Sequence, residues 1–234
     1  MLTLRRAGER HHDPRRGGDA WLTFSGHRRD DLLRDGFGGL EVLDEVRLRS
    51  HAATPHRATQ PWEIVTYVRE GQVEVGDPTA GMSTLRAGEF QRQTAGRAPG
   101  LTLIGASRAG GAHAFQLSLR LAAVGPTPGH EHKRFSAADR RGGLCPVASP
   151  DARGGSLLLH ADAVIFSALL DPGQHVVHAL AGGRRAWLHL VAGEVTIGDV
   201  VLTTGDGAGV DGTRAASFTA RQATEVLLID LGPG

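Results

Sequence analysis

Residues 68–77 read VREGQVEVGD, and residues 191–199 repeat the pattern as VAGEVTIGD. In both copies an apolar strand ends at a glycine turn, and a second strand then alternates apolar and polar residues up to a Gly-Asp pair. A further match follows each copy, because LRAGEF at 85–90 and LTTGDG at 202–207 share the pattern L-x-x-G-[DE]. An internal repeat of this kind predicts two similar domains in tandem.

Strand patterns dominate the rest of the chain. Residues 40–48 and 114–121 alternate apolar and polar side chains, and residues 63–68 are rich in β-branched and aromatic types. We expect short helices only near residues 30–34 and 136–141. Many short strands joined by glycine turns predict an all-β fold of two jelly-roll-type β-barrels, the tandem cupin (bicupin) architecture.

The stretch from residue 124 to residue 155 differs from its surroundings in being rich in Gly, Pro and charge. We interpret it as a connection that runs over the surface between the domains. The predicted division is therefore an N-terminal cupin at 1–123, a connecting segment at 124–155 and a C-terminal cupin at 156–234.

Composition limits the classes of function. A net charge of +1 gives no indication of a nucleic-acid or membrane surface. One cysteine excludes an intramolecular disulfide and is typical of a reducing compartment. No run approaches the roughly 18 apolar residues of a membrane helix, and the N-terminus lacks a signal-peptide core. We expect a cytoplasmic protein, a monomer or weak dimer, whose partner is a small molecule or a protein.

Four stretches are similar to motifs of the pirin family, whose members are two-barrel cupins related to quercetin 2,3-dioxygenase. Residues 63–71 (EIVTYVREG) resemble the family's E-I-L-T-Y-V-L-E-G, and residues 87–96 (AGEFQRQTAG) resemble A-G-E-F-Q-x-M-S-A-G. The others are LRRA at 4–7 followed by LTFS at 22–25, and SPDARGGSL at 149–157. The resemblance covers nearly the whole chain.

This resemblance implies one Fe(II)-like metal in the N-terminal barrel, held by three histidines and a glutamate. It also implies quercetin 2,3-dioxygenase-like ring opening or, in eukaryotic relatives, transcriptional co-regulation. Carried over position by position, the four ligands fall on Arg57, Thr59, Leu101 and Leu103. Arginine only donates hydrogen bonds, and leucine has no lone pair to give. We therefore predict that the family metal site is lost and that no metal cofactor is held there.

Other residues remain candidates for the pocket of the N-terminal barrel. Arg57 either points inward, paired with Glu63 or an anion, or lies in solvent on a rerouted strand, which we favour. His113, with Gln116, either lines the pocket or is a hydrogen-bonded strand histidine, which we favour. The possible pocket-lining residues are His56, Arg57, Glu63, His113 and Gln116.

The remaining histidines and the cysteine have ordinary structural explanations. His130 and His132 flank Glu131 with a ligand-like spacing, but a solvated loop is the interpretation we favour over a metal site. We interpret His175, His178 and His189 as structural, since the second barrel has no H-x-H followed by a glutamate. Cys145 has no neighbouring base and is expected to be inert.

Two functions follow. The first is a pirin-like protein without the usual metal, with a non-catalytic binding or regulatory role. The alternative is a quercetin 2,3-dioxygenase-like oxygenase that holds its metal through unorthodox ligands such as His56 and His113.

Overall fold

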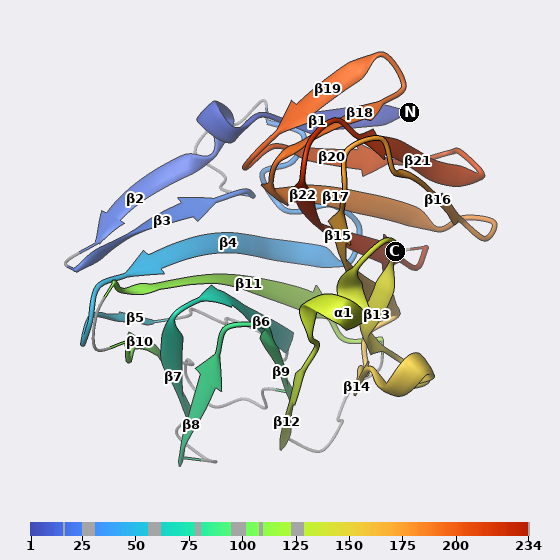
Figure 1. Cartoon of the computed structure of the whole chain (residues 1–234). Helices are drawn as coiled ribbons and strands as arrows, with labels where there is room; N and C mark the ends of the chain where they lie inside the picture. The colour runs from blue at the N-terminus through green and yellow to red at the C-terminus, as the bar shows by residue number, and fades with distance from the viewer. Residues whose placement is uncertain are drawn as a thin grey trace.

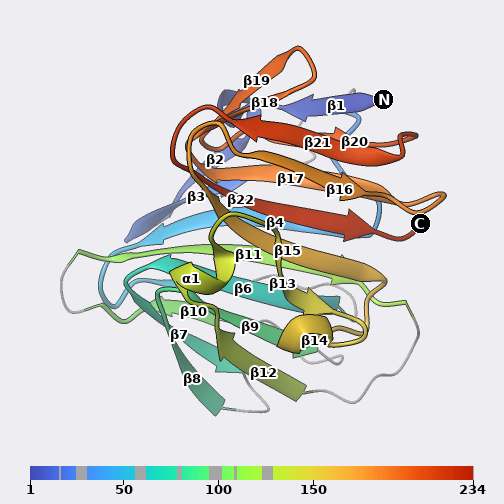
Figure 2. The same ribbon diagram turned by 45° about the vertical axis from the view of Figure 1, so that its right-hand side comes forward.

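The computed structural model describes residues 1–15, 17–24, 31–55, 62–77, 81–94, 102–107, 110–122 and 129–233. Strands make up most of its regular structure, as Figures 1 and 2 show from two directions. They form two barrels, each built from a seven-stranded sheet and a four-stranded sheet. The prediction of an all-β fold with two tandem barrels is confirmed.

The first barrel is made mainly from the first half of the chain. Its seven-stranded sheet has the spatial order β12 (Gly129–Arg134), β9 (Glu89–Thr94), β6 (Trp62–Glu70), β11 (Ala112–Arg120), β4 (Leu40–Leu48), β3 (Gly18–Leu22) and β2 (His11–Arg15). Its four-stranded sheet has the order β5 (Ala53–Pro55), β10 (Thr102–Gly105), β7 (Gln72–Asp77) and β8 (Gly81–Arg86). The repeat at 68–77 therefore spans the end of β6 and β7.

The second barrel repeats this arrangement. Its larger sheet has the order β1 (Leu2–Arg5), β20 (Gly207–Val210), β17 (Arg185–Ala192), β22 (Thr224–Leu231), β15 (Ala163–Leu170), β13 (Cys145–Ser149) and β14 (Leu157–Leu158). Its smaller sheet has the order β16 (His175–Ala179), β21 (Ala215–Ala220), β18 (Glu194–Ile197) and β19 (Val200–Thr203). The second copy of the repeat spans the end of β17 and β18.

Three apolar cores hold this structure together. One fills the first barrel and includes Ile64, Val75 and Leu103, and a second fills the second barrel. The third contains residues of both large sheets, such as Tyr67 and Trp187, so it lies between the barrels. The central strands of each large sheet are consequently buried on both faces.

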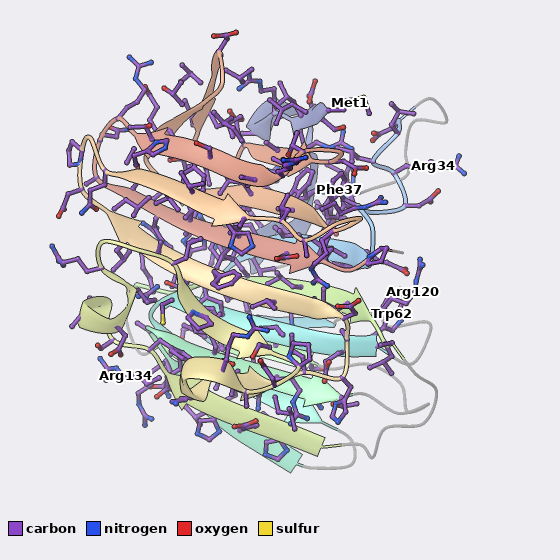
Figure 3. All side chains as sticks on the ribbon, turned by 90° about the vertical axis from the view of Figure 1, so that its right-hand side faces the viewer. Met1, Arg34, Phe37, Trp62, Arg120 and Arg134 are labelled. Carbon is purple, nitrogen blue, oxygen red and sulfur yellow. The ribbon has the colours of Figure 1, made fainter. Side chains whose placement is uncertain are left out.

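The N-terminal strand belongs to the second barrel, although the sequence places it in the first domain. β1 pairs antiparallel with β20, so that Leu2 faces Val210 and Arg5 faces Gly207. In Figure 3 Met1 lies beside the strands of the second barrel, whereas Trp62 and Arg120 lie at one end of the first. Dividing the chain at a single point therefore does not separate the two barrels.

The segment at 124–155 is more than a surface connection. Its described part contributes β12 to the first barrel's sheet and β13 to the second barrel's sheet, where Val147 and Ala148 are fully buried. Between them lies the short helix α1 (Ala137–Arg140), capped by Ser136, which matches the helix expected at 136–141. Of the helix expected at 30–34, residues 32–34 form turns instead, and residue 30 lies outside the described residues.

Short 3₁₀ turns are the remaining helical elements of the described chain, at η1 (Ala7–Glu9) and η2 (Arg153–Gly155). No helix of the described residues is long and apolar enough to cross a membrane.

Candidate functional site

The inner face of the first barrel's large sheet can be assigned residue by residue. On β6, Ile64 and Val68 pack in the core inside the barrel, whereas Val65 and Tyr67 pack in the core between the barrels. Because successive residues of a strand point to opposite faces, Thr66 faces the barrel interior. Strand register then carries the assignment to the neighbouring strands.

A row of buried polar side chains crosses this inner face. Gln116 on β11 is paired with Thr66 on β6, which is paired with Gln91 on β9. All three residues are at most 3% exposed. The Gln91 amide donates to Ser83 Oγ at 2.7 Å, but Gln91 Oε1 and Gln116 Nε2 have no hydrogen-bond partner in the described part of the chain. A buried polar atom left unpaired costs about 1–3 kcal/mol, so a bound polar molecule would recover hydrogen bonds here.

Leu103 lies on the opposite wall of this barrel. It is fully buried between its cross-strand neighbours Val75 and Thr54 and belongs to the apolar core inside the barrel. This position, where the resemblance implies a carboxylate ligand, therefore contributes only packing.

The residues at the four carried-over positions include none of the family's histidine or glutamate ligands, and the loss of the metal site stays a prediction. His56, Arg57, Thr59 and Leu101 lie outside the described residues, but guanidinium and aliphatic side chains are not metal ligands whatever their placement. Within the described ranges, no group of three or more His, Cys, Asp or Glu is arranged to hold a metal ion. We therefore derive no chemistry through a metal at these positions.

The expectation that Glu63 lines the pocket of the first barrel is wrong. Its odd-numbered position on β6 places the side chain on the outer face, where it is fully buried. Its carboxylate accepts hydrogen bonds from the backbone N–H groups of His160 at 2.6 Å and Ala161 at 2.9 Å. The Thr94 hydroxyl donates to it at 3.0 Å, and Arg92 Nε lies 3.9 Å away. Glu63 thus fastens the second half of the chain to the first barrel.

His113 also points away from the barrel interior. It lies two residues from Phe115 on β11 and so shares its face, and Phe115 packs between the barrels. The buried ring contacts Glu45 Oε1 through Nε2 at 2.9 Å and Arg69 Nη1 through Nδ1 at 3.4 Å. Burial alone would raise the pKa of Glu45, but the hydrogen bond from His113 and the charge of Arg10 outweigh it and lower the pKa to about 2. His113 is therefore committed to an ion-pair network and is not an inner-face metal ligand.

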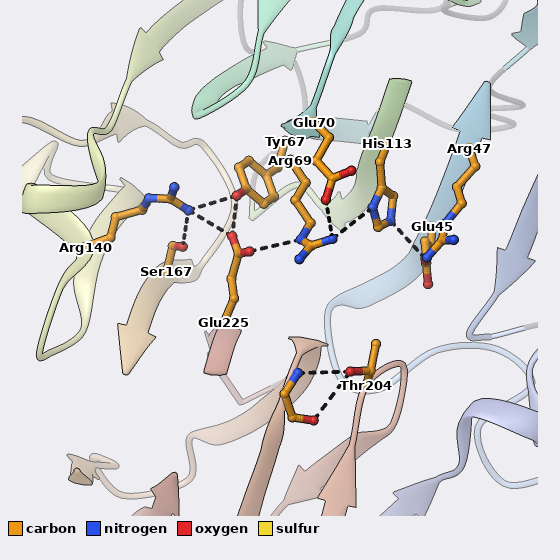
Figure 4. A network of polar contacts seen from close by, with 11 residues as sticks. Glu45, Arg47, Tyr67, Arg69, Glu70, His113, Arg140, Ser167, Thr204 and Glu225 are labelled. Atoms are coloured by element: carbon orange, nitrogen blue, oxygen red, sulfur yellow. Dashed lines mark hydrogen bonds and ion pairs between the residues drawn. The ribbon is translucent and has the colours of Figure 1, made fainter. Parts of the chain in front are cut away.

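This network continues to the second barrel, as Figure 4 shows. Arg69 Nε donates to Glu225 Oε2 at 3.1 Å, and Arg140 Nη1 donates to Glu225 Oε1 at 3.0 Å. The Tyr67 hydroxyl also donates to Glu225 Oε1. Burial and the charge of Glu225 raise the pKa of Tyr67, so this hydroxyl keeps its proton. The network joins β6 and β11 of one barrel to β22 of the other.

Sequence reasoning missed Tyr67, Arg140 and Glu225 as a unit. Tyr67 and Glu225 lie 158 positions apart, and only Tyr67 occurs in one of the four stretches that resemble family motifs. A glutamate at the start of the apolar stretch 225–231 was the one visible indication, because a charge entering a buried strand needs a partner.

His189 is fully buried between the barrels, 5.7 Å from the Phe115 ring between centroids. Neither ring nitrogen has a hydrogen-bond partner among the described residues. Burial, and then the charge of Arg10, lowers the pKa of His189 to about 3. The ring is consequently neutral in the folded protein at neutral pH.

His189→Leu is expected to reduce the slope with which the free energy of unfolding falls as the pH decreases. Below the ordinary pKa of 6.5 the unfolded state binds a proton that the folded state takes up only near pH 3, so the free energy of unfolding falls as the pH decreases between these values. The slope contributed by one such group is at most about 1.4 kcal/mol per pH unit. Urea unfolding at several pH values measures it. His175→Leu, which removes an exposed histidine, should keep the wild-type slope, and the same slope in His189→Leu would contradict the assignment.

The other histidines and the cysteine have local roles. His130, Glu131 and His132 lie on β12, which is exposed throughout, so the expected loop is in fact a strand. His175 contacts Thr219 Oγ1 at 2.8 Å, and His178 contacts Asp230 at 2.7 Å. Burial raises the pKa of the Cys145 thiol, which makes it a poor nucleophile.

Comparison with known proteins agrees with this architecture. The family described as the quercetinase C-terminal cupin domain matches residues 146–231. Over 233 residues the chain is 35% identical to a protein named quercetin 2,3-dioxygenase from Escherichia coli K12, and the match covers 100% of both chains. The bacterial pirin YhhW from Escherichia coli, solved in complex with nickel(II), matches with a TM-score of 0.88 and 35% identity over 100% of both chains. The chain belongs to the pirin family.

A more distant pirin relative gives the same assignment. A pirin-like protein from Caulobacter vibrioides is 27% identical over 204 residues, which cover 83% of this chain and 84% of the relative. Family membership therefore rests on similarity along the whole chain and on both barrels.

Proposed function

We propose that this pirin-family protein binds a small polyhydroxylated molecule of the flavonol class inside its first barrel, without a metal at the family positions. The observation that carries the proposal is the buried row of Gln116, Thr66 and Gln91 opposite the apolar Leu103, with two amide atoms that have no hydrogen-bond partner among the described residues. Such a mixture of apolar wall and a few fixed polar groups is typical of small-molecule sites. The flavonol class comes from the name of the 35% identical relative.

The binding test uses the wild-type protein and two variants. Quercetin titrated into the wild type is expected to bind, as measured by calorimetry or fluorescence quenching. Gln116→Met keeps the side-chain size but removes the amide, so the affinity should fall about tenfold, the equivalent of about 1.4 kcal/mol. The stability of Gln116→Met should be unchanged or higher, because the unpaired amide is gone.

Gln222→Leu is the matched control, since Gln222 is exposed in the second barrel. It should bind quercetin like the wild type. An absence of quercetin binding by the wild type, or equal affinity in Gln116→Met, would contradict the proposal.

A metal-dependent dioxygenase is the second candidate, because similar proteins carry the quercetin 2,3-dioxygenase name and one was solved with nickel(II). Elemental analysis after loading with Fe, Ni, Cu or Mn distinguishes the two. Stoichiometric metal, with quercetin depletion and O₂ uptake above the blank, would favour the dioxygenase. Quercetin binding without either would favour the proposal.

A further inference from the structure

A pocket lies outside the first barrel's interior. It has a volume of about 690 Å³ and lies where β4 and β6 end and β3 and β11 begin. Arg47, Arg49, Arg69 and His113 line it. In Figure 4 Arg47 lies at one end of the network between the barrels, and His113 and then Arg69 follow toward Glu225.

Glycines allow the strands around this pocket to approach closely. A Cβ at Gly18 would lie 2.2 Å from the carbonyl oxygen of Arg47, and a Cβ at Gly111 would lie 2.6 Å from that of Leu48. Gly111 also has a φ of +75°, which side-chain-bearing residues rarely adopt. The pocket wall is therefore fixed by backbone that tolerates no larger residue.

The acidic groups on the pocket wall are already paired. Asp19 contacts His12 Nε2 at 2.8 Å, and Glu70 accepts from Arg69 at 2.7 Å. Arg69 is shared between Glu70 and Glu225. Glu70 is therefore already partnered by a guanidinium, and Asp19 is in contact with an imidazole ring.

Two guanidinium groups, by contrast, have spare donors. Arg47 is exposed, touches Glu45 only at 3.4 Å, and lies 5.5 Å from the centroid of the Trp21 ring. Arg49 is exposed, and it makes no ion pair with any described residue. A guanidinium presents a planar fork of donors that matches the geometry of carboxylates and phosphates.

We propose that this pocket binds a small oxyanion, a carboxylate or phosphate compound, through Arg47 and Arg49. Arg69 and His113 form the base of the site and stay held by Glu225 and Glu45. The site is separate from the flavonol site proposed inside the first barrel, so neither depends on the other.

The experiment titrates inorganic phosphate and malonate separately into the full-length protein by calorimetry at low salt. At least one should bind, more weakly as ionic strength rises, because exposed charges are screened. Binding of only one identifies the oxyanion as phosphate or carboxylate. In the double variant Arg47→Gln/Arg49→Gln the affinity should fall at least tenfold. Arg214→Gln, which removes an exposed arginine of the second barrel, should bind like the wild type.

A second measurement uses only the wild type and so does not depend on variant folding. Phenylglyoxal modification of Arg49, followed by mass spectrometry, should be slowed by the bound anion, whereas modification of Arg214 should not. Failure of both anions to bind, unchanged affinity in the double variant, or equal protection of both arginines would overturn the proposal. Quercetin binding in the double variant should remain intact.

Discussion

Glu225→Ala is expected to lower the free energy of unfolding by about 3–5 kcal/mol, because it leaves buried positive charge without its counter-ion. Glu225 is 9% exposed and accepts hydrogen bonds from Arg140, Arg69 and Tyr67. The Arg140 side chain is only 8% exposed, so water cannot replace the lost carboxylate. Chemical unfolding at neutral pH measures the change.

Glu70→Ala is the matched control, since Glu70 pairs with the same Arg69 but its side chain is 64% exposed. An exposed pair contributes about 0–1 kcal/mol, so this variant should remain close to the wild type. Equal losses in the two variants would show that burial of the network between the barrels is not what makes it stabilising. A double-mutant cycle with Tyr67→Phe would isolate the Tyr67 contribution.

Glu63→Ala should cause a loss of similar size, about 3–5 kcal/mol, through a different set of partners. The substitution leaves the backbone N–H groups of His160 and Ala161 without their shared acceptor, and it removes the carboxylate that lies 3.9 Å from Arg92 Nε. Because Glu63 lies on the outer face of β6, this loss should occur with no direct effect on the quercetin affinity of the folded variant.

The matched control is Glu89→Ala, whose carboxylate accepts a single exposed backbone N–H, that of Arg86 at 2.8 Å. Its removal should cost about 1 kcal/mol or less. A Glu63→Ala protein as stable as the wild type would contradict the structural role of Glu63. A variant that stays stable but loses quercetin binding would indicate that Glu63 lines the pocket.

The sequence was sufficient for the architecture but not for the direction of individual side chains. The strand–glycine–strand pattern occurs at 68–77 and again at 191–199, and this repeat predicts two similar barrels. The glycine is visible in both copies because the tight turn between the two strands requires it. Side-chain direction is harder in residues 62–70, since this strand is buried on one face by its own barrel and on the other by the second barrel. Alternation of apolar and polar residues disappears when both faces are covered, so Glu63 could not be assigned to a face.

Burial of both faces also explains why only one of the two pocket candidates on β11 faces the barrel interior. Gln116 faces the barrel interior and His113 faces the network with Glu45, although both were candidates for one pocket. The ion pairs between the barrels join residues far apart in the sequence, and only the packing of the two large sheets brings them together. The predicted ligand positions Arg57, Thr59 and Leu101 lie outside the described residues, so their orientation stays a prediction.

The pairing of β1 with β20 has a consequence for biosynthesis. The ribosome makes residues 2–5 about two hundred residues before their partner strand at 207–210. The sheet strands of the first barrel can pair while the chain is still being translated, but β1 must wait beside the exit tunnel until β20 has emerged. Residues 2–5 are thus among the last parts of the described chain to reach their native position.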